Sequence, residues 1–514
     1  MALAAGAGVG SAAPADGRSG GNDSASPGRG ARSGDARVNP GDTSRPASRS
    51  TPGPVAVRRS PATAKATATA AGTRATPGLT APLNHAPAAA ATADAPGLPP
   101  GPIAAAVLAA QAYIYGYPLL EFEKYRSGVT SLNTLTSFTT FARPDTVPIW
   151  RPNTDTLYSR AVLDLSNGPV VLSIPDMGSR YYSFQLNDPY TNVSGYIGSR
   201  STGSGPGVYA ITWSGGPQVA VDGAQVISVP YPSMLLLGRT LAGDPADQQS
   251  AMALMNQYTL TATGASGSPP AKTPAPEGLA LLDAISAAME LNPPPAADAP
   301  ALEAFRRIGV GVGTRVADAH LGVLATLAAD LTLRAFAALG PMLAMATQYV
   351  SAFQHGGWAT PDAAIGNYGV DYLLRAGVSN IGPWANTPNE AIYSAGLLDS
   401  NLLPLNGLRS YVIHFAPGAE PPAGAFWSVT VYGSQGQLVA NSLNRYSISN
   451  SRPGELLRRP DGSIDIILSQ TDPGDSGANW LPVPPDWFTA YLRVYVPQGD
   501  VLDGSWRPPP IKPI

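Results

Sequence analysis

The chain has 514 residues, of which only 13% are charged, and its 55 glycines and 53 prolines make up about a fifth of the whole. Because single hydrophobic cores stop growing at about 250 to 300 residues, this length predicts more than one domain. The absence of cysteine excludes disulfides, thiolate nucleophiles and cysteine-ligated metals, and it leaves the cell compartment open.

The charge of the chain is unevenly divided. Residues 1–100 hold ten Lys or Arg and five Asp or Glu, which leaves 22 basic and 30 acidic residues, a net charge of −8, for the remainder. An acidic body offers no cluster of Lys and Arg to neutralise phosphates. The composition therefore predicts that the chain does not bind nucleic acid.

Residues 1–98 are rich in Ala, Gly, Ser, Pro and Arg and contain no aromatic residue. Such a segment cannot bury enough apolar surface to offset the entropy of ordering, so we expect a disordered arm. Its arginine content leaves a targeting role open. No apolar core of a secretion signal follows the basic residues, however, which argues against a working signal.

Residues 99–243 are expected to form an N-terminal β-domain with a leading helix. The helix is "IAAAVLAAQAYIYGYPLLEFEKY", which turns polar too early to span a bilayer. "VVLSIP", "RYYSFQL", "GVYAITW", "QVISVP" and "MLLLGRT" then read as antiparallel strands separated by turn residues. In "RYYSFQL" the two faces differ, which predicts that one face packs and the other does not.

Residues 244–385 are expected to form a helical connecting region. In "HLGVLATLAADLTLRAFAALGPMLAMATQYVSAF", Leu324, Leu327 and Leu331 recur at helical spacing. Asp330 and Arg334 lie one turn apart in the same run, which favours a buried bundle helix over a membrane span. The pair at 340–341, Gly-Pro, is expected to kink or end this helix.

Residues 386–514 are expected to form a second β-domain, with strands at "YVIHF", "FWSVTVYG", "SIDIILS" and "YLRVYVP". In the last of these strands Arg493 shares a face with Tyr491 and Tyr495. A cation over flanking tyrosine rings on a solvated face is the simplest interpretation.

Several segments carry a family resemblance. "RPNTDTLYSRAVLDL" and "GPVVLSIPDMGSRYYSFQLNDPYTNVSGYIGSRSTG" resemble the domain of unknown function 1254, and "FWSVTVYGSQGQLVANSLNRYSISN", "NWLPVP" and "LDGSWRPPPI" resemble its usual C-terminal companion, domain of unknown function 1214. The resemblance covers nearly all of residues 102–514. It implies an α+β, β-dominated fold of two jelly-roll-like antiparallel β-sandwich domains with a helical connection.

Candidate catalytic residues lie in two polar motifs of the first β-domain. A short turn followed by a strand would place small polar groups at a sandwich rim, where ligands commonly bind, although Asx turns and packing explain the same residues. Arginines beside carboxylates could hold an anionic ligand or simply tie loops together. The catalytic candidates are Asp155, Tyr158, Arg180 and Asp188.

Candidate ligand-binding residues lie in both β-domains. Those of the C-terminal domain, together with Trp427, could build an aromatic-walled pocket that stacks on sugar or ring faces, although tryptophan in a sandwich core is the commoner finding. The candidates are Asn153, Tyr181, Asn192 and Arg200 in the first domain, beside Tyr190, and Asn441, Asn444, Arg445, Tyr446 and Trp480 in the second.

The sequence supports no cofactor site. The four histidines are not spaced as metal ligands, and no Gly-x-Ser-x-Gly motif or phosphate-binding loop is present. The segment "TDPGDSG" leaves oxygen-ligated calcium open, but it lacks the acidic density of a recognised calcium loop. We therefore predict no cofactor and no metal.

Two functions remain open. The first is a cofactor-independent hydrolase or lyase acting on a small organic or carbohydrate-like molecule in a pocket between the β-domains. The second is a non-catalytic ligand-binding or cell-envelope interaction protein. Relatives often carry export signals, so the resemblance slightly favours the cell envelope or secretion. A homo-oligomer is compatible with either function.

Overall fold

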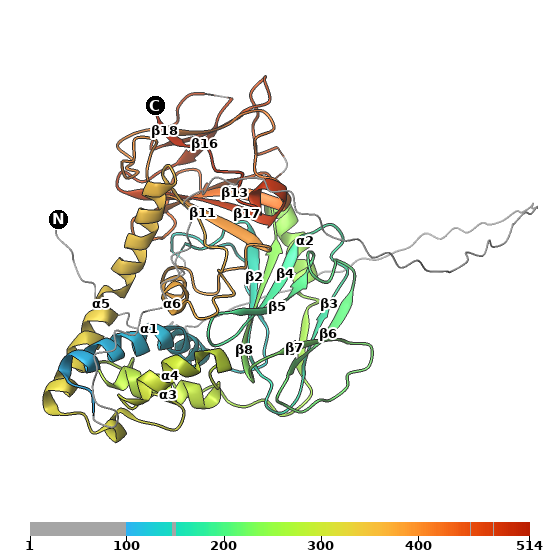
Figure 1. Cartoon of the computed structure of the whole chain (residues 1–514). Coiled ribbons are helices and arrows are strands. Elements are labelled where there is room, and N and C mark those ends of the chain that lie inside the picture. Colours follow the sequence, from blue (N-terminus) through green and yellow to red (C-terminus); the bar gives the residue numbers. More distant parts are fainter. Residues whose placement is uncertain (1–98, 146–150, 453, 476) are drawn as a thin grey trace, which may run out of the picture. The chain divides into compact units, whose positions relative to one another are not determined.

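The computed structural model describes residues 99–514 except 146–150, 453 and 476 (Figure 1). The arm expected to be disordered, residues 1–98, lies outside the described residues. Two β-sandwiches and a set of helices account for the described residues, which confirms the expected fold class.

The N-terminal sandwich consists of a five-stranded sheet in the order β1-β2-β8-β4-β5 and a four-stranded sheet in the order β7-β6-β3-β9. All neighbouring strands are antiparallel except β6 and β7, which are parallel. The strands are β1 (Thr136–Ser137), β2 (Thr156–Asp164), β3 (Val170–Ile174), β4 (Tyr182–Asn187), β5 (Val193–Gly198), β6 (Gly207–Trp213), β7 (Gln225–Val229), β8 (Ser233–Leu241) and β9 (Thr259–Ala262).

The C-terminal sandwich consists of a five-stranded sheet in the order β10-β11-β17-β13-β14 and a four-stranded sheet in the order β16-β15-β12-β18. Here β15 and β16 are the parallel pair. The strands are β10 (Trp358–Ala359), β11 (Ala391–Gly396), β12 (Tyr411–Phe415), β13 (Ala423–Gly433), β14 (Ser447–Ser449), β15 (Ile464–Ser469), β16 (Asn479–Pro482), β17 (Phe488–Pro497) and β18 (Ile511–Pro513).

The two sandwiches have the same topology. Adding nine to each strand number of the first sandwich gives the strand order of both sheets of the second, and the parallel pair falls at the same place. Such agreement across eighteen strands is far more specific than a shared fold class. We conclude that the chain contains one sandwich fold twice, an internal repeat that the sequence patterns did not reveal.

Each sandwich encloses its own core. In the first, Leu157 and Phe184 of the five-stranded sheet pack with Val170 and Ile211 of the four-stranded sheet. The second core, which includes Trp427, Leu492, Ile413 and Ile466, is arranged in the same way. Residues that alternate with these core positions, such as Arg239 of β8 and Arg493 of β17, contact the other half of the chain.

In the sequence, α1 precedes the first sandwich and the other helices lie between β8 and β11. They are α1 (Pro102–Arg126), α2 (Pro245–Met255), α3 (Ala280–Leu291), α4 (Ala299–Arg306), α5 (Val323–Gln354) and α6 (Tyr372–Ile381), with short 3₁₀ turns η1 (Ala296–Asp298), η2 (Val316–Ala319) and η3 (Gly499–Val501). Helix α1 contacts α3, α5 and α6, and α5 reaches from α1 to β10 and β11 (Figure 1). The helical region also contains β9 and β10, which complete one sheet in each sandwich.

The structure corrects the expectation for "RYYSFQL". Every residue of β4 is buried, so both faces of this strand pack. One face contributes to the sandwich core through Phe184, and the other contacts the C-terminal half through Tyr181 and Gln185.

Helix α5 also differs from its expectation. Leu324, Leu327 and Leu331, expected to be buried in a bundle, are 69%, 53% and 58% exposed, whereas the alanines on the opposite face pack against neighbours. The helix does not end at Gly340 or Pro341. By length and composition alone, α1 and α5 would each be sufficient to cross a membrane, but half of the apolar window of α1 is buried within the protein.

We predict that Gly198→Ala destabilises the protein by about 1 to 3 kcal/mol, the range for overpacked sites. A Cβ at this position would lie 2.5 Å from the carbonyl oxygen of Tyr182 and 2.8 Å from the Cα of Ser183, so backbone would have to move. Urea denaturation of the full chain measures the loss.

Gly195→Ala on the same strand is the matched control, because its Cβ would meet only side-chain atoms at 3.8 Å and 3.9 Å. We expect this variant to be neutral or slightly stabilising. Equal effects of the two substitutions would contradict the close pairing of β4 with β5.

Candidate functional site

The two five-stranded sheets meet through the faces that point away from the sandwich cores. Tyr181 of the first half packs edge-to-face on Tyr495 of β17, with ring centroids 5.5 Å apart, and also contacts Phe426 of β13. The Asn153 amide donates to the Tyr495 hydroxyl at 2.6 Å. The junction of the two domains is therefore a buried surface that is rich in tyrosine and polar groups.

Two ion pairs cross this junction in opposite directions. Asp155, fully buried, accepts hydrogen bonds from Ser428 Oγ at 2.6 Å and from Arg452 Nη2 at 3.1 Å. Glu390 accepts from Tyr181 Oη at 2.7 Å and from Arg200 Nε at 2.6 Å. Each half thus contributes one buried carboxylate and one arginine to the other.

These contacts follow the internal repeat. In the first sheet Arg239 of β8 lies between Tyr158 of β2 and Ser183 of β4. In the second, Arg493 of β17 lies between Tyr393 of β11 and Ser428 of β13. Asp155 precedes Tyr158 by three residues, as Glu390 precedes Tyr393. Arg200 follows the outer strand β5, as Arg452 follows the outer strand β14. The junction is therefore built from equivalent positions of the two halves.

The strand pattern indicated that Arg493 lies on a solvated face, but the structure shows that it is buried. It is 4% exposed, and its side chain donates to Thr430 Oγ1, to the Tyr432 hydroxyl and to the carbonyl oxygen of Arg151. The guanidinium does lie over the ring of Tyr491, at 5.4 Å, and over that of Tyr432. The face is buried because the other half of the chain covers it.

Arg239 is the equivalent residue of the first half and is equally buried, but it is less completely bonded. Its Nη1 donates to Gln185 Oε1 at 2.7 Å and to Asn386 Oδ1 at 3.2 Å. Within the described part of the chain its Nε and Nη2 have no hydrogen-bond acceptor, and no carboxylate lies within ion-pair distance. A buried arginine in this state carries an uncompensated positive charge.

Tyrosines surround this guanidinium. The ring of Tyr158 lies 5.8 Å from it, and the hydroxyl of Tyr158 has no hydrogen-bond partner among residues 99–514 as described. Tyr158 and Tyr393 are half-buried, whereas Tyr181 and Tyr495 are buried. Burial holds the pKa of both Tyr181 and Tyr495 well above the usual value, so their hydroxyls stay protonated.

The structure divides the candidate residues of the first domain into two groups. Asn153, Asp155, Tyr158, Tyr181 and Arg200 all lie at the domain junction. Arg180 does not, because its guanidinium pairs with Asp247 of α2 and donates to the carbonyl oxygen of Leu241. It pairs with neither Asp188 nor a residue of the junction.

The second group lies at the β4–β5 hairpin. Asp188 accepts from the backbone N–H and the Nδ2 of Asn192, at 2.9 Å and 3.0 Å, and Tyr190 donates to the carbonyl oxygen of Asn292. The arginine near this group is Arg375 of α6, whose guanidinium lies over the ring of Tyr190. Asp155 and Asp188 have no hydrogen-bond partner in common.

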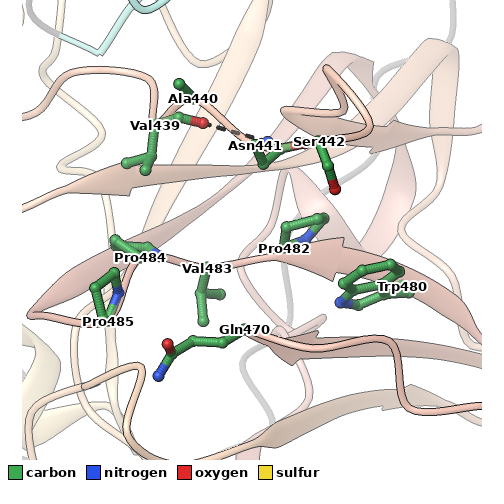
Figure 2. A pocket seen from close by; sticks show the side chains of 10 residues that line it. All are labelled: Val439, Ala440, Asn441, Ser442, Gln470, Trp480, Pro482, Val483, Pro484 and Pro485. Carbon is green, nitrogen blue, oxygen red and sulfur yellow. Dashed lines mark hydrogen bonds between the residues drawn. The ribbon is translucent and has the colours of Figure 1, made fainter.

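A separate pocket of about 230 Å³ opens at one rim of the C-terminal sandwich (Figure 2). Trp480 and Gln470 lie on one side of it and the segment around Asn441 and Ser442 on the other, as Figure 2 shows. None of its lining residues carries a charge. They are Val439, Ala440, Asn441, Ser442, Gln470, Trp480, Pro482, Val483, Pro484 and Pro485.

The ligand-binding candidates of the second domain differ in their relation to this pocket. Asn441 lines it, but its amide is engaged in holding the loop, donating to the carbonyl oxygens of Val439 and Arg445. Arg445 donates to the carbonyl oxygen of Trp480 and so fixes the wall from behind. Asn444 and Tyr446 hydrogen-bond to each other and do not line the pocket.

No cluster of metal-ligating side chains occurs among the residues that the structure describes. In the segment that left calcium open, Asp475 is engaged in an ion pair with Arg459. His414 lies beside Asp465, with Nδ1 2.6 Å from the carboxylate, and no third candidate ligand accompanies them.

Comparison with known families identifies both halves of the chain. Residues 132–262 match the family described as "Protein of unknown function (DUF1254)", and residues 390–499 match that of DUF1214. The chain therefore carries a DUF1254 domain followed by a DUF1214 domain. The two domains occur in the order that the resemblance implied, and each match covers most of one sandwich.

The chain is similar to two solved structures of bacterial proteins, to different degrees. The VPA0106 protein from Vibrio parahaemolyticus is 24% identical, with a TM-score of 0.59 over 80% of this chain and 100% of that one. An uncharacterized protein from Burkholderia cenocepacia is 15% identical, with a TM-score of 0.39 over 79% and 87% of the two chains. No curated protein matches the chain. The first similarity supports the fold and carries no activity.

Sequence reasoning missed Arg239, Tyr393, Glu390 and Arg452, and it misplaced Arg493. One signal was present: "PNTDTLYS", residues 152–159, and "PNEAIYS", residues 388–394, each contain Pro-Asn, an acidic residue and Tyr-Ser. Alignment of these two segments would have paired the halves and drawn attention to the arginines opposite each tyrosine.

We predict that Asp188 makes the stability of the DUF1254 domain depend on pH. Burial raises the pKa of this carboxyl to about 6. The folded state therefore keeps a proton that the unfolded state releases near pH 4, and stability falls as pH rises from about 4 to about 6. For this group the loss amounts to as much as about 3 kcal/mol.

Denaturation of the wild type and of Asp188→Asn at pH 4 and pH 7 isolates this contribution. From pH 4 to pH 7 the unfolding free energy of the wild type should fall by up to about 3 kcal/mol more than that of the variant. If the difference in unfolding free energy is the same at both, Asp188 is not the buried titrating group described here.

Proposed function

We propose that this DUF1254–DUF1214 protein binds a small organic anion, a carboxylate, at the junction of its two β-domains. The single observation that carries the proposal is Arg239, which is 5% exposed and has no carboxylate partner in the described residues. Burying a charged group without a partner is costly, so a site of this kind favours an anion from outside the chain.

The geometry of the arginine supports a carboxylate in particular. The Nε–H and one Nη2–H of a guanidinium point along the same edge, and their spacing matches the two oxygens of a carboxylate. In Arg239 this edge is the one without an acceptor, since both hydrogen bonds are made by Nη1. The ring of Tyr158, whose hydroxyl has no hydrogen-bond partner in the described residues, lies 5.8 Å from this guanidinium.

The charge of the junction points the same way. Asp155 and Glu390 are each paired with another arginine, and neither lies within ion-pair distance of Arg239. Tyr158 and Tyr393 are the half-buried members of the cluster, so solvent reaches it at these two residues.

Binding is better supported than hydrolysis or elimination. Asp155 accepts hydrogen bonds from Ser428 and Arg452, so it has little capacity to act as a general base. The predicted catalytic residues Arg180 and Asp188 lie outside the cluster. We therefore assign Asp155 a structural role and Tyr158 a role in binding.

The rim pocket supports a second binding function, for a neutral ligand with a ring. Its lining offers the indole of Trp480 and the polar groups of Gln470 and Ser442 without any charge. Tryptophan rings stack on apolar ring faces, and about 230 Å³ is below the 300 to 1,000 Å³ of pockets for drug-sized ligands. One sugar-sized unit suits this space.

We predict that small carboxylates raise the melting temperature of the full chain above the effect of chloride at equal ionic strength. Succinate, citrate and benzoate are the probes, read by thermal shift and confirmed by calorimetry. Arg239→Lys keeps the positive charge but loses the two parallel N–H donors of the guanidinium, so affinity for carboxylates should fall about tenfold or more.

Two further variants make this test decisive. Tyr158→Phe removes only the hydroxyl and should weaken binding while preserving the fold. Arg180→Lys alters an arginine outside the cluster and should leave binding unchanged. A wild type that responds to no carboxylate, or an Arg239→Lys variant that binds as well as the wild type, contradicts the proposal.

We predict that Trp480→Ala abolishes the binding of neutral sugars at the rim pocket, because it removes the stacking face. Saturation-transfer NMR with glucose, galactose and N-acetylglucosamine measures the contact. Trp487→Ala is the matched control, since Trp487 is 50% exposed and does not line the pocket. Equal signals from both variants would locate any sugar binding elsewhere.

A further inference from the structure

One face of α5 exposes a run of large apolar side chains that the described residues leave uncovered. Ten large apolar side chains on this helix are 38 to 84% exposed. They are Val323, Leu324, Leu327, Leu331, Leu339, Met342, Leu343, Tyr349, Val350 and Phe353. The opposite face packs against the protein through Ala325, Ala329, Leu333, Ala344 and Ala352. A helix that is apolar on both faces is expected to be buried on both.

Five of these exposed residues, Leu324, Leu331, Met342, Tyr349 and Phe353, lie together with alanines on one stripe along the helix. From Leu324 to Phe353, positions 324, 328, 331, 335, 338, 342, 346, 349 and 353 follow one another at steps of three or four, which places them on a single face. A helix of 32 residues is about 48 Å long, and at a width of about 10 Å such a stripe covers about 500 Å². Patches of this size on monomers often mark interaction sites.

Two other coverings are disfavoured. Residues 1–98 contain no aromatic side chain and few large aliphatic ones, so they have little to pack into the stripe. Helices that lie on membranes carry Lys and Arg on the polar face. Here α5 has only Arg334, which is already paired with Asp330 and Glu277, and the chain beyond residue 100 has a net charge of −8.

We infer that two copies of this chain associate through α5, with the two helices antiparallel about a two-fold axis that passes beside Ala338 and Leu339. The reason for this register is that α5 is complementary to itself when reversed. A two-fold axis at its centre pairs large residues with small ones along most of the stripe. The facing pairs are Leu324 with Phe353, Ala328 with Tyr349, Leu331 with Ala346, Ala335 with Met342, and Ala338 with Leu339.

The area is sufficient for specific association. Two stripes of about 500 Å² bury about 1,000 Å² in total, the lower limit for a specific interface. Alanines at the centre allow the two helix axes to approach to the lower end of the usual 8 to 10 Å. The interface is apolar throughout, as in dimers that form permanently.

The oligomeric state of the full chain is the first test. Sedimentation equilibrium at micromolar concentration should give about twice the 52.8 kDa of one chain. Leu331→Glu would place a charge in the interface opposite Ala346, which should raise the dimer dissociation constant at least about a hundredfold. Leu408→Glu is the control, because Leu408 is 79% exposed on the C-terminal domain, and it should remain dimeric.

Disulfide crosslinking tests the register and the antiparallel direction. Because the chain has no cysteine, a single Ala338→Cys reports only on the interface. This variant should form a covalent dimer on mild oxidation, since the axis brings the two copies of residue 338 together. Ala337→Cys, also exposed but off the stripe, should crosslink poorly, and Leu324→Cys should crosslink with Phe353→Cys and not with itself.

Three results would overturn the inference. One is a monomeric wild type at these concentrations, and another is a dimer that Leu331→Glu leaves intact. The third is a monomer that co-sediments with phosphatidylcholine vesicles and loses this property in Leu331→Glu, because the apolar stripe would then face lipid.

Discussion

The structure depends on two buried ion pairs that cross the domain junction in opposite directions. Asp155 and Glu390 each reach into the other half, where Arg452 and Arg200 meet them. A buried carboxylate is tolerated only with a partner, so loss of either arginine while the domains stay joined would leave a buried charge unpaired, at a cost of about 3 to 5 kcal/mol. This reciprocity fixes the two sandwiches in one arrangement, and the tyrosine rings of the junction fill the space between the pairs.

The same arrangement explains why the sequence could predict the strands but not the burial of their side chains. The alternation in "GVYAITW" and "YVIHF" gives the strand bounds that the structure has. Alternation also suggests one buried and one solvent-exposed face, which is correct for a sheet with solvent on one side. The five-stranded sheets here have protein on both sides. Arg493 and Gln185 therefore sit on faces that look polar in sequence and are buried in the structure.

Helix α5 shows the reverse error. Leucines at helical spacing with an Asp–Arg pair indicated a buried bundle helix, but the surface they form is exposed in a single chain. A periodic pattern reports that a face is apolar, and it does not report which molecule covers it. If a second copy covers α5, the original interpretation of the leucines holds for the assembly. The candidate site, by contrast, depends on residues up to 342 positions apart, such as Asn153 and Tyr495, which no local pattern connects.

The internal repeat locates the asymmetry on which the proposed function rests. Arg493 and Arg239 occupy equivalent positions, and the strands beside them offer Thr430 and Tyr432 in one half and Gln185 and Asn187 in the other. Tyr432 is long enough for its hydroxyl to reach the guanidinium of Arg493, and with Thr430 it completes that arginine's partners. Asn187 is shorter, accepts from Gln185, and makes no bond to Arg239. If the two halves were identical, either both arginines or neither would have a full set of hydrogen-bond partners. In this chain one arginine holds the domains together and the other keeps an edge of its guanidinium without a partner, as a site for an external carboxylate requires.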